Sequence, residues 1–326
     1  MYLHKYVNGG CLRASDRIVF LLSPGKVFRK NASLIKSYFE QVPSIDNAPT
    51  TIHASVDVYT GKNIFVGEMM KYLEENVQED IVGAYVHGSF GTYEEINYSD
   101  FDGLVILKDE VIKNGNRLAN VVRHLSETRK FMLQIDPLQH HGWFVLTESD
   151  LNNYPQTLFP SELFQYAKSL FNDQGRELNL RIDYDKQDYS ASFIRLCKSI
   201  ERKLTAKKYP QNMYELKNLL SEFMLLPALY IQSRDKKGVF KKFSFEEARK
   251  DFSQQQWRIM DEVSLVRQQW KMQERKRKLL THTRLLSFNM AKILSPAIPK
   301  ELNQRMDDKF YQSMLDFTKA IRAKTK

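Results

Sequence analysis

Residues 81–107 constrain the fold more than any other stretch, because two short apolar runs enclose a segment rich in glycine, serine and acidic residues. The runs at 81–86 and 104–107 are rich in β-branched residues, which predicts two buried strands. Gly88 and Ser89 follow the first run, at an expected strand-to-helix turn. A residue without a side chain lets a phosphate approach the backbone there, and free N–H groups at the helix start face it.

Asp100 and Asp102 open the second run. Strand side chains alternate, so the two carboxylates are expected on one face and Phe101 on the other, in the core. Paired carboxylates beside a phosphate-binding turn favour magnesium. Two plainer alternatives exist. The pattern Asp-x-Asp-Gly also begins calcium loops, but the third ligand and the later glutamate of such loops are missing. Asp100 could also merely cap a turn, with Asp102 an exposed charge at a strand edge.

The stretch resembles the signature of the nucleotidyltransferase superfamily, which includes DNA polymerase beta and the antibiotic nucleotidyltransferases. That signature is a hydrophobic strand, Gly followed by Gly or Ser, a gap of about ten residues as a helix requires, and then Asp, a hydrophobic residue, and Asp or Glu. Gly88, Ser89, Asp100, Phe101 and Asp102 fill every position. The resemblance implies two magnesium ions that hold a nucleoside triphosphate while an acceptor attacks the α-phosphorus and pyrophosphate leaves.

The same resemblance implies a third carboxylate, on a later strand beside the Asp-x-Asp strand. Residues 131–135 alternate in polarity and predict a strand that ends at Asp136. Asp136 is therefore expected as the third metal ligand, as the base that activates the acceptor, or as both. Glu148 and Asp150 are alternatives, but they follow the next expected strand, at 143–146, and are more typical of helix caps.

Three histidines lie near these residues in the sequence. His140 and His141 are adjacent, and adjacent side chains on an extended chain point to opposite sides, so the two are not expected to bind one ion. One of them could contact phosphate, or could orient the loop of Asp136 through hydrogen bonds. His87 precedes Gly88 and is open to the same two interpretations.

Composition favours a packed protein of two domains: 326 residues, 42% of them hydrophobic and 12% aromatic. Cys11 and Cys197 are far apart and have no metal-binding spacing, which indicates reduced thiols and a cytoplasmic protein. The apolar run at 18–22 is too short for a signal peptide core. No run approaches the ~20 residues of a transmembrane helix, so no membrane association is expected.

Charge is distributed unevenly. Residues 1–180 contain 17 Lys and Arg against 22 Asp and Glu, a net −5, whereas residues 181–326 contain 32 against 17, a net +15. The basic half could face the triphosphate or a polyanionic acceptor such as RNA, although solvated helix faces look the same. By analogy, Lys198 and Arg202 are assigned to the β- and γ-phosphates. Trp270, close to basic residues, could stack a nucleic-acid base, although exposed helices share this pattern.

We expect an α+β fold in three parts: an N-terminal extension (1–60), a nucleotidyltransferase domain with a mixed sheet and flanking helices (61–182), and an all-helical substrate-binding domain (183–326). The extension is expected to hold a strand at 17–22 and a helix at 32–41. The next domain is expected to hold helices at 62–77 and 161–170 and an edge strand at 177–182. Residues 215–252 resemble the helical substrate domain of kanamycin-type nucleotidyltransferases, and Pro227 predicts a kink there. The active site is expected between the last two domains.

The expected function is magnesium-dependent transfer of a nucleoside monophosphate from a triphosphate, with ATP favoured, to a hydroxyl of a small molecule. An RNA end or a protein side chain is the alternative acceptor. A different class of function also stays open, namely an inactive nucleotidyltransferase fold that acts as a binding protein, in a complex or as the neutralising partner of a toxin. Residue patterns leave the oligomeric state open.

Overall fold

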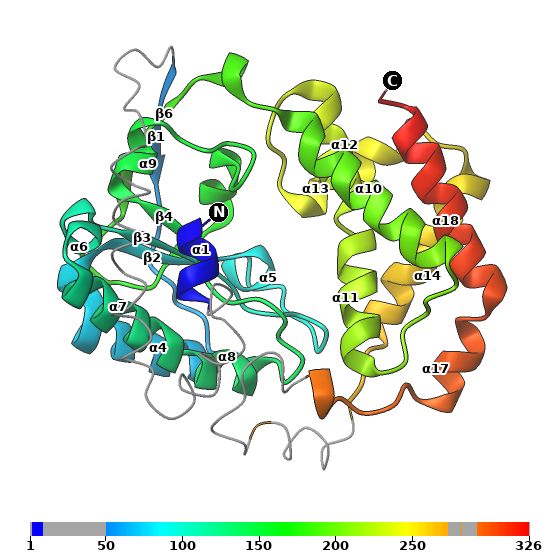
Figure 1. The fold of residues 1–326 in the computed structure, drawn as a ribbon, viewed down its shortest axis with the longest axis horizontal. Helices are drawn as coiled ribbons and strands as arrows, with labels where there is room; N and C mark the ends of the chain where they lie inside the picture. The colour runs from blue at the N-terminus through cyan, green and yellow to red at the C-terminus, as the bar shows by residue number, and fades with distance from the viewer. Residues whose placement is uncertain (1, 9–49, 273–280, 282–291, 326) are drawn as a thin grey trace.

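A computed structural model describes residues 2–8, 50–272, 281 and 292–325, and Figure 1 shows their arrangement. Strands and helices alternate up to residue 182, in what we call the sheet region, and helices follow from residue 189, in the helical region. The fold is thus α+β, as expected, with a mixed sheet and a helical C-terminal part. The strand and the helix expected at 17–22 and 32–41 lie outside the described residues.

The central sheet has four strands in the order β4–β3–β2–β5. They are β2 (Ile81–His87), β3 (Asp102–Leu107), β4 (Phe144–Thr147) and β5 (Lys168–Ser169). Strand β2 is antiparallel to β3 and β5, whereas β3 and β4 are parallel. Strands β2, β3 and β4 confirm the strands that were predicted from the apolar runs at 81–86, 104–107 and 143–146. β2 and β3 are buried along nearly their whole length because other elements cover both faces of the sheet.

Helices cover one face of this sheet (Figure 1). They are α4 (Ile64–Val77), α7 (Gly115–Glu127), α8 (Arg129–Ile135) and the short α1 (Tyr2–Val7). The side chain of Asn63 caps α4 by accepting hydrogen bonds from the N–H groups of Phe65 and Val66. Its buried residues recur at helical spacing: Val66, Met69, Leu73 and Val77. The helix expected at 62–77 is therefore confirmed.

A two-stranded ribbon covers the other face of the sheet. Strand β1 (Thr50–Ser55) pairs antiparallel with β6 (Glu177–Ile182). Apolar side chains of β6, such as Leu180, pack with Leu104 and Ile106 of β3 in one cluster. The strand expected at 177–182 is confirmed. Its partner, β1, lies in residues 1–60, which were expected to form only an N-terminal extension. Part of that segment therefore contributes to the core.

Two elements of the sheet region differ from expectation. Residues 131–135 form helix α8 and not a strand. The run Phe-Met-Leu-Gln-Ile is apolar at both the strand and the helix period, and packing decides for a helix because Phe131, Met132 and Ile135 join the cluster beneath the sheet. The helix expected at 161–170 is instead a 3-10 helix, η2 (Ser161–Tyr166), followed by β5. Shorter elements complete the region: η1 (Gln78–Asp80), α5 (Gly88–Gly91), α6 (Asp109–Lys113) and α9 (Glu148–Asn152).

The helical region has its own large apolar cluster, which also takes in Tyr98 and Leu138 of the sheet region. After η3 (Tyr184–Lys186) its described helices are α10 (Tyr189–Thr205), α11 (Met213–Phe223), α12 (Leu226–Asp235), α13 (Lys241–Arg249), α14 (Gln254–Gln268), α17 (Lys300–Arg305) and α18 (Asp308–Ala323). Pro227 lies in the first turn of α12, so the chain starts a new helix there instead of kinking a continuous one.

Trp270 is part of that core. It is 3% exposed, and its ring lies edge-on to Tyr98 with the ring centroids 5.1 Å apart. The hypothesis that Trp270 stacks a nucleic-acid base is therefore wrong, because the indole already packs against protein. Among the helices that the structure describes, none is long and apolar enough to cross a membrane.

Candidate active site

The turn after β2 places Gly88 against one of the predicted carboxylates. Gly88 has a φ of +65°, a conformation that favours glycine, and a Cβ built on it would lie 2.6 Å from Asp102 Oδ2. The following helix, α5, has only four residues, shorter than the signature's gap suggests. Gly88 and Ser89 thus lie at a strand-to-helix turn, as predicted, but on a single helical turn.

Asp102 is the first residue of β3 and Asp100 lies two residues before it, on either side of a buried aromatic residue. Phe101 is fully buried, and its ring lies edge-on to Trp143 with the centroids 5.6 Å apart. The two carboxylates keep 18% and 28% of their side-chain surface exposed. The predicted alternation is confirmed: the aromatic ring is in the core and the acidic groups are accessible.

His141 lies between the two carboxylates. Its Nε2 atom is 3.2 Å from Asp100 Oδ2 and 3.2 Å from Asp102 Oδ1. Burial alone would lower the pKa of His141, but hydrogen bonds and charge from both carboxylates outweigh it and raise that pKa well above its usual range. Burial likewise opposes ionisation of Asp100, yet the positive charge of Lys217, with the hydrogen bond and charge of His141, holds the pKa of Asp100 well below its usual range. The position between the oxygens of Asp100 and Asp102 therefore favours a positively charged group.

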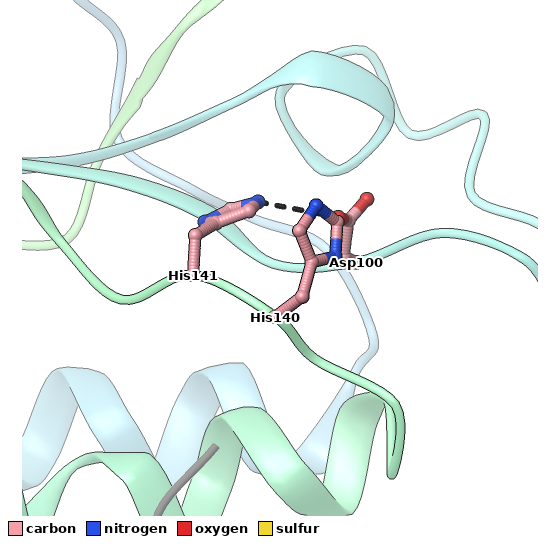
Figure 2. Close-up of side chains that lie close together, drawn as sticks. All are labelled: Asp100, His140 and His141. Atoms are coloured by element: carbon pink, nitrogen blue, oxygen red, sulfur yellow. Dashed lines mark hydrogen bonds and ion pairs between the residues drawn. The ribbon is translucent and has the colours of Figure 1, made fainter. Parts of the chain in front are cut away.

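His140 reaches the same point from the neighbouring position. Its Nδ1 atom lies 3.6 Å from Asp100 Oδ2, and its ring is edge-on to that of His141 (Figure 2). The expectation that the two histidines diverge is wrong, because strand β4 begins only at Phe144 and the chain before it does not follow strand alternation. Burial, with the nearby positive charges of His141 and Lys217, lowers the pKa of His140 to about 4.

Gln139 joins the histidine loop to the aspartate segment. Its Oε1 accepts a hydrogen bond from the Phe101 N–H at 2.9 Å, while its Nε2 donates to the carbonyls of Phe101 and His141 at 2.9 and 2.8 Å. The side chain is fully buried. Sequence reasoning did not single it out, since a glutamine in a loop carries no signal of such a role. It fixes the two segments side by side.

Asp136 is held in a buried ion pair and is not among the donor atoms grouped at Asp100, His140 and His141. It follows helix α8, and its Oδ2 forms a 2.6 Å ion pair with Nζ of Lys217, while its Oδ1 accepts from the Leu138 N–H at 3.0 Å. Both side chains are buried, at 4% and 0% exposed. The strand beside β3 is β4, whose register pairs Leu104 with Phe144. If that parallel register is extended toward the N-terminal ends of β3 and β4, His140 and His141, and not Asp136, lie alongside the segment of Asp100 and Asp102.

Basic groups of the helical region face the acidic ones. Burial lowers the pKa of Lys241, at the start of α13, to about 8; the charge of Arg267 adds to this effect, and Asp100 and Asp102 partly offset it. The guanidinium of Arg267, on α14, lies 4.6 Å from the Tyr98 ring centre, and its Nε is buried without a hydrogen-bond partner. The only signal for Lys241 in the sequence was the basic run at 234–242.

One of the remaining predicted residues borders this group: His87 pairs with Asp102 in the β2–β3 register. Lys198 and Arg202 are exposed on α10, and neither forms a hydrogen bond or ion pair with the described part of the site. His87 is buried with Nε2 unpartnered, and burial lowers its pKa. Asp150 caps α9 in a capping box, as anticipated for that residue, and Glu148 lies in the first turn of the same helix.

No model of a known protein family matches the chain, and a search of the curated proteins finds no match either. What the arrangement can do therefore follows from its own chemistry. Two accessible carboxylates and two imidazoles converge beside a glycine turn, opposite Lys241 and Arg267. Such a group can hold a divalent cation on one side and an anionic ligand on the other.

Proposed function

We propose that this protein is a nucleotidyltransferase of the DNA polymerase beta-like superfamily, which transfers a nucleoside monophosphate from a triphosphate to a hydroxyl. The convergence of Asp100 and Asp102 on one nitrogen, directly beside the left-handed Gly88, is the observation that carries the proposal. It supplies the two carboxylates and the side-chain-free turn that the resemblance requires. The pattern is thus supported in space as well as in sequence.

Asp100 and Asp102 would hold magnesium, which is typically bound through one or two carboxylates together with substrate phosphates. When bound, the metal neutralises charge on the phosphoryl group that is transferred. Gly88 and Ser89 would donate hydrogen bonds from the turn to phosphate oxygens. Lys241, together with Arg267, takes the role expected of Lys198 and Arg202. Lys241 lies within range of the charges of both carboxylates and of Arg267, whose buried Nε lacks a partner.

For the acceptor, we propose a small hydroxylated molecule, with ATP as the donor and the cytoplasm as the location. The buried free thiol of Cys197 accords with a reducing compartment. An RNA end or a protein side chain is the alternative acceptor, and the net +15 of residues 181–326 supports RNA. Added salt separates these acceptors, since RNA binding weakens steeply with salt in proportion to the phosphates contacted.

One contact favours a second candidate, a nucleotide-binding protein that performs no transfer. The third carboxylate of the resemblance, Asp136, is buried and held by Lys217, so it is not presented to an acceptor hydroxyl while that ion pair stands. His141 occupies the space between the other two carboxylates instead. A fold that keeps the nucleotide site and lacks the activating carboxylate would bind triphosphate without turnover.

The test is to incubate the full chain with each labelled triphosphate, magnesium and a panel of hydroxylated acceptors, and to measure pyrophosphate release. Asp100→Asn and Asp102→Asn remove a metal ligand at little change in volume, so each should lower turnover at least ~100-fold. Asp261→Asn, at an exposed position on α14, is the matched control and should match the unmodified protein. Full turnover in both site variants would refute the assignment. Tight triphosphate binding without pyrophosphate release would establish the second candidate.

A further inference from the structure

Three donor atoms of the site are spaced for one metal ion. Ligand atoms of Asp100, His140 and His141 all lie within 4.8 Å of one another (Figure 2). Two donors bound to one ion at about 2.1 Å are at most about 4.2 Å apart. Closing the group onto an ion therefore needs only a small inward movement of the two rings.

The histidine nitrogens that would bind the ion lie next to Asp100. The Nδ1 atom of His141 lies 3.2 Å from the carbonyl oxygen of Gly142, to which an N–H at Nδ1 can donate. Metal-binding histidines commonly hold their second nitrogen in this way. The Nε2 atom lies 3.2 Å from oxygens of both Asp100 and Asp102, and a metal ion would replace the proton that Nε2 shares with these carboxylates. The Nδ1 atom of His140 is buried and has no hydrogen-bond partner, so nothing competes with a metal for it.

The donor types indicate the class of ion. Magnesium prefers oxygen ligands, whereas imidazole nitrogen suits zinc, cobalt, nickel and ferrous iron. Two imidazoles and one carboxylate from three nearby residues therefore differ from an all-oxygen magnesium site. Gln139 adds rigidity, because it binds the backbone carbonyls of both His141 and Phe101.

We infer that Asp100, His140 and His141 form a binding site for a borderline transition-metal ion such as Zn²⁺ or Co²⁺, which holds that ion more tightly than Mg²⁺. The site shares Asp100 with the proposed function but requires no nucleotide and no transfer. Asp102 contacts Nε2 of His141 but is not one of the three grouped donors, and it is left for the cation that a triphosphate brings. The two proposals can therefore fail separately.

Cobalt is the probe, because nitrogen ligation of Co²⁺ produces a visible absorption spectrum. The full chain, freed of metal with a chelator, should bind one Co²⁺ per chain, with an absorption that Zn²⁺ abolishes and a large excess of Mg²⁺ does not. His140→Gln and His141→Gln should each weaken Co²⁺ binding at least ~100-fold. His53→Gln, on exposed strand β1, is the matched control and should bind as the unmodified chain does.

Asp102→Asn separates the two proposals: it should lose nucleotidyl transfer and keep Co²⁺ binding. If His141→Gln fails to fold, His140→Gln still decides, because the Nδ1 atom of His140 has no hydrogen bond to lose. Equal affinity of the unmodified chain for Co²⁺ and Mg²⁺, or unchanged Co²⁺ binding in a folded His140→Gln protein, would overturn the inference. Absence of transfer by the unmodified chain, with intact Co²⁺ binding, would overturn the proposed function alone.

Discussion

Gly88 and Asp102 are in contact across the antiparallel pair β2–β3, so closely that a Cβ at position 88 would lie 2.6 Å from Asp102 Oδ2. On the side of the turn where a Cβ would point, the space is therefore filled by the Asp102 carboxylate. A side chain at position 88 would have to displace the Asp102 carboxylate, which we assign to the metal. The conformation of the turn and the position of this metal ligand therefore depend on each other.

Gly88→Ala should therefore harm the site more than the fold. The left-handed φ costs a residue with a side chain about 1–2 kcal/mol, and displacement of Asp102 should remove most metal-dependent nucleotide binding. Thermal unfolding and triphosphate titration measure the two effects. Gly67→Ala is the control: nothing lies within 4 Å of its Cβ on helix α4, so it should stabilise the protein by about 0.5–1 kcal/mol. Unchanged nucleotide binding in Gly88→Ala would contradict the assignment.

The buried pair Asp136–Lys217 should behave as a structural link between the two regions. Lys217→Met leaves a buried unpaired carboxylate and should lower the free energy of unfolding by about 3–5 kcal/mol. The double variant with Asp136→Asn should lose less than the sum of the single losses, as urea unfolding would show. Lys203→Met, which breaks the partly exposed pair with Glu222, should cost less than about 1 kcal/mol.

A different result for this pair would change the mechanism. If Asp136→Asn folded with full stability but lost nucleotidyl transfer, Asp136 would return to the set of catalytic groups, and the ion pair with Lys217 would have to open during the reaction.

Lys241 should give triphosphate binding a pH dependence. Its pKa is lowered to about 8, so the ammonium loses its proton, and the triphosphate a positive partner, as the pH rises through 8. We expect affinity to fall at least ~10-fold between pH 7 and 9.5, since a hydrogen bond to a charged group is worth about 1.5–3 kcal/mol. Lys241→Arg stays charged and should bind independently of pH over this range, while Lys241→Gln should bind weakly throughout.

The same lysine affects stability with the opposite sign. In the unfolded chain it keeps its proton up to about pH 10.4, so between pH 8 and that value the unfolded state binds more protons, and the free energy of unfolding rises with pH. Lys237→Gln, at an exposed position nearby in the sequence, is the control for both measurements and should leave both pH profiles unchanged. A flat binding profile in the unmodified protein would remove Lys241 from the site.

Gln139→Leu should loosen the site and destabilise the fold together. It leaves the N–H and C=O of Phe101 and the carbonyl of His141 without their partner, and an unsatisfied buried group costs about 1–3 kcal/mol. Urea unfolding should show a loss of at least ~2 kcal/mol, and amide hydrogen exchange at Phe101 should quicken. Gln312→Leu, at an exposed position on α18, should change neither measurement. Unaltered exchange at Phe101 would show that Gln139 does not hold this segment.

The sequence predicted those parts of the molecule whose pattern is local. Strands β2 and β3 have apolar runs of strand length, helix α4 has apolar residues at helical spacing, and the alternation of Asp100, Phe101 and Asp102 follows from strand geometry alone. Each of these features depends on residues within about one turn or one strand of each other. Contacts with the rest of the chain do not alter these local structures.

The parts that the sequence misplaced depend on contacts between distant segments. Helix α8 fits two periodicities, and only its packing under the sheet excludes a strand that would have carried Asp136 to the site. The pairing of β4 with β3 brings the histidines there instead. Lys217 and Lys241 come from helices far along the chain, and no local pattern distinguishes them from the other lysines of a basic region.

The ribbon of β1 and β6 affects how the protein can be shortened. Because β1 lies before the predicted domain start at residue 61, a chain cut there would leave β6 as an unpaired edge, with the apolar residues Leu178, Leu180 and Ile182 stripped of cover. Such a fragment should aggregate. Since β1 and β6 lie side by side, the ends of a fragment spanning 50–182 would both be held by this ribbon, and new termini could instead be opened elsewhere on the surface.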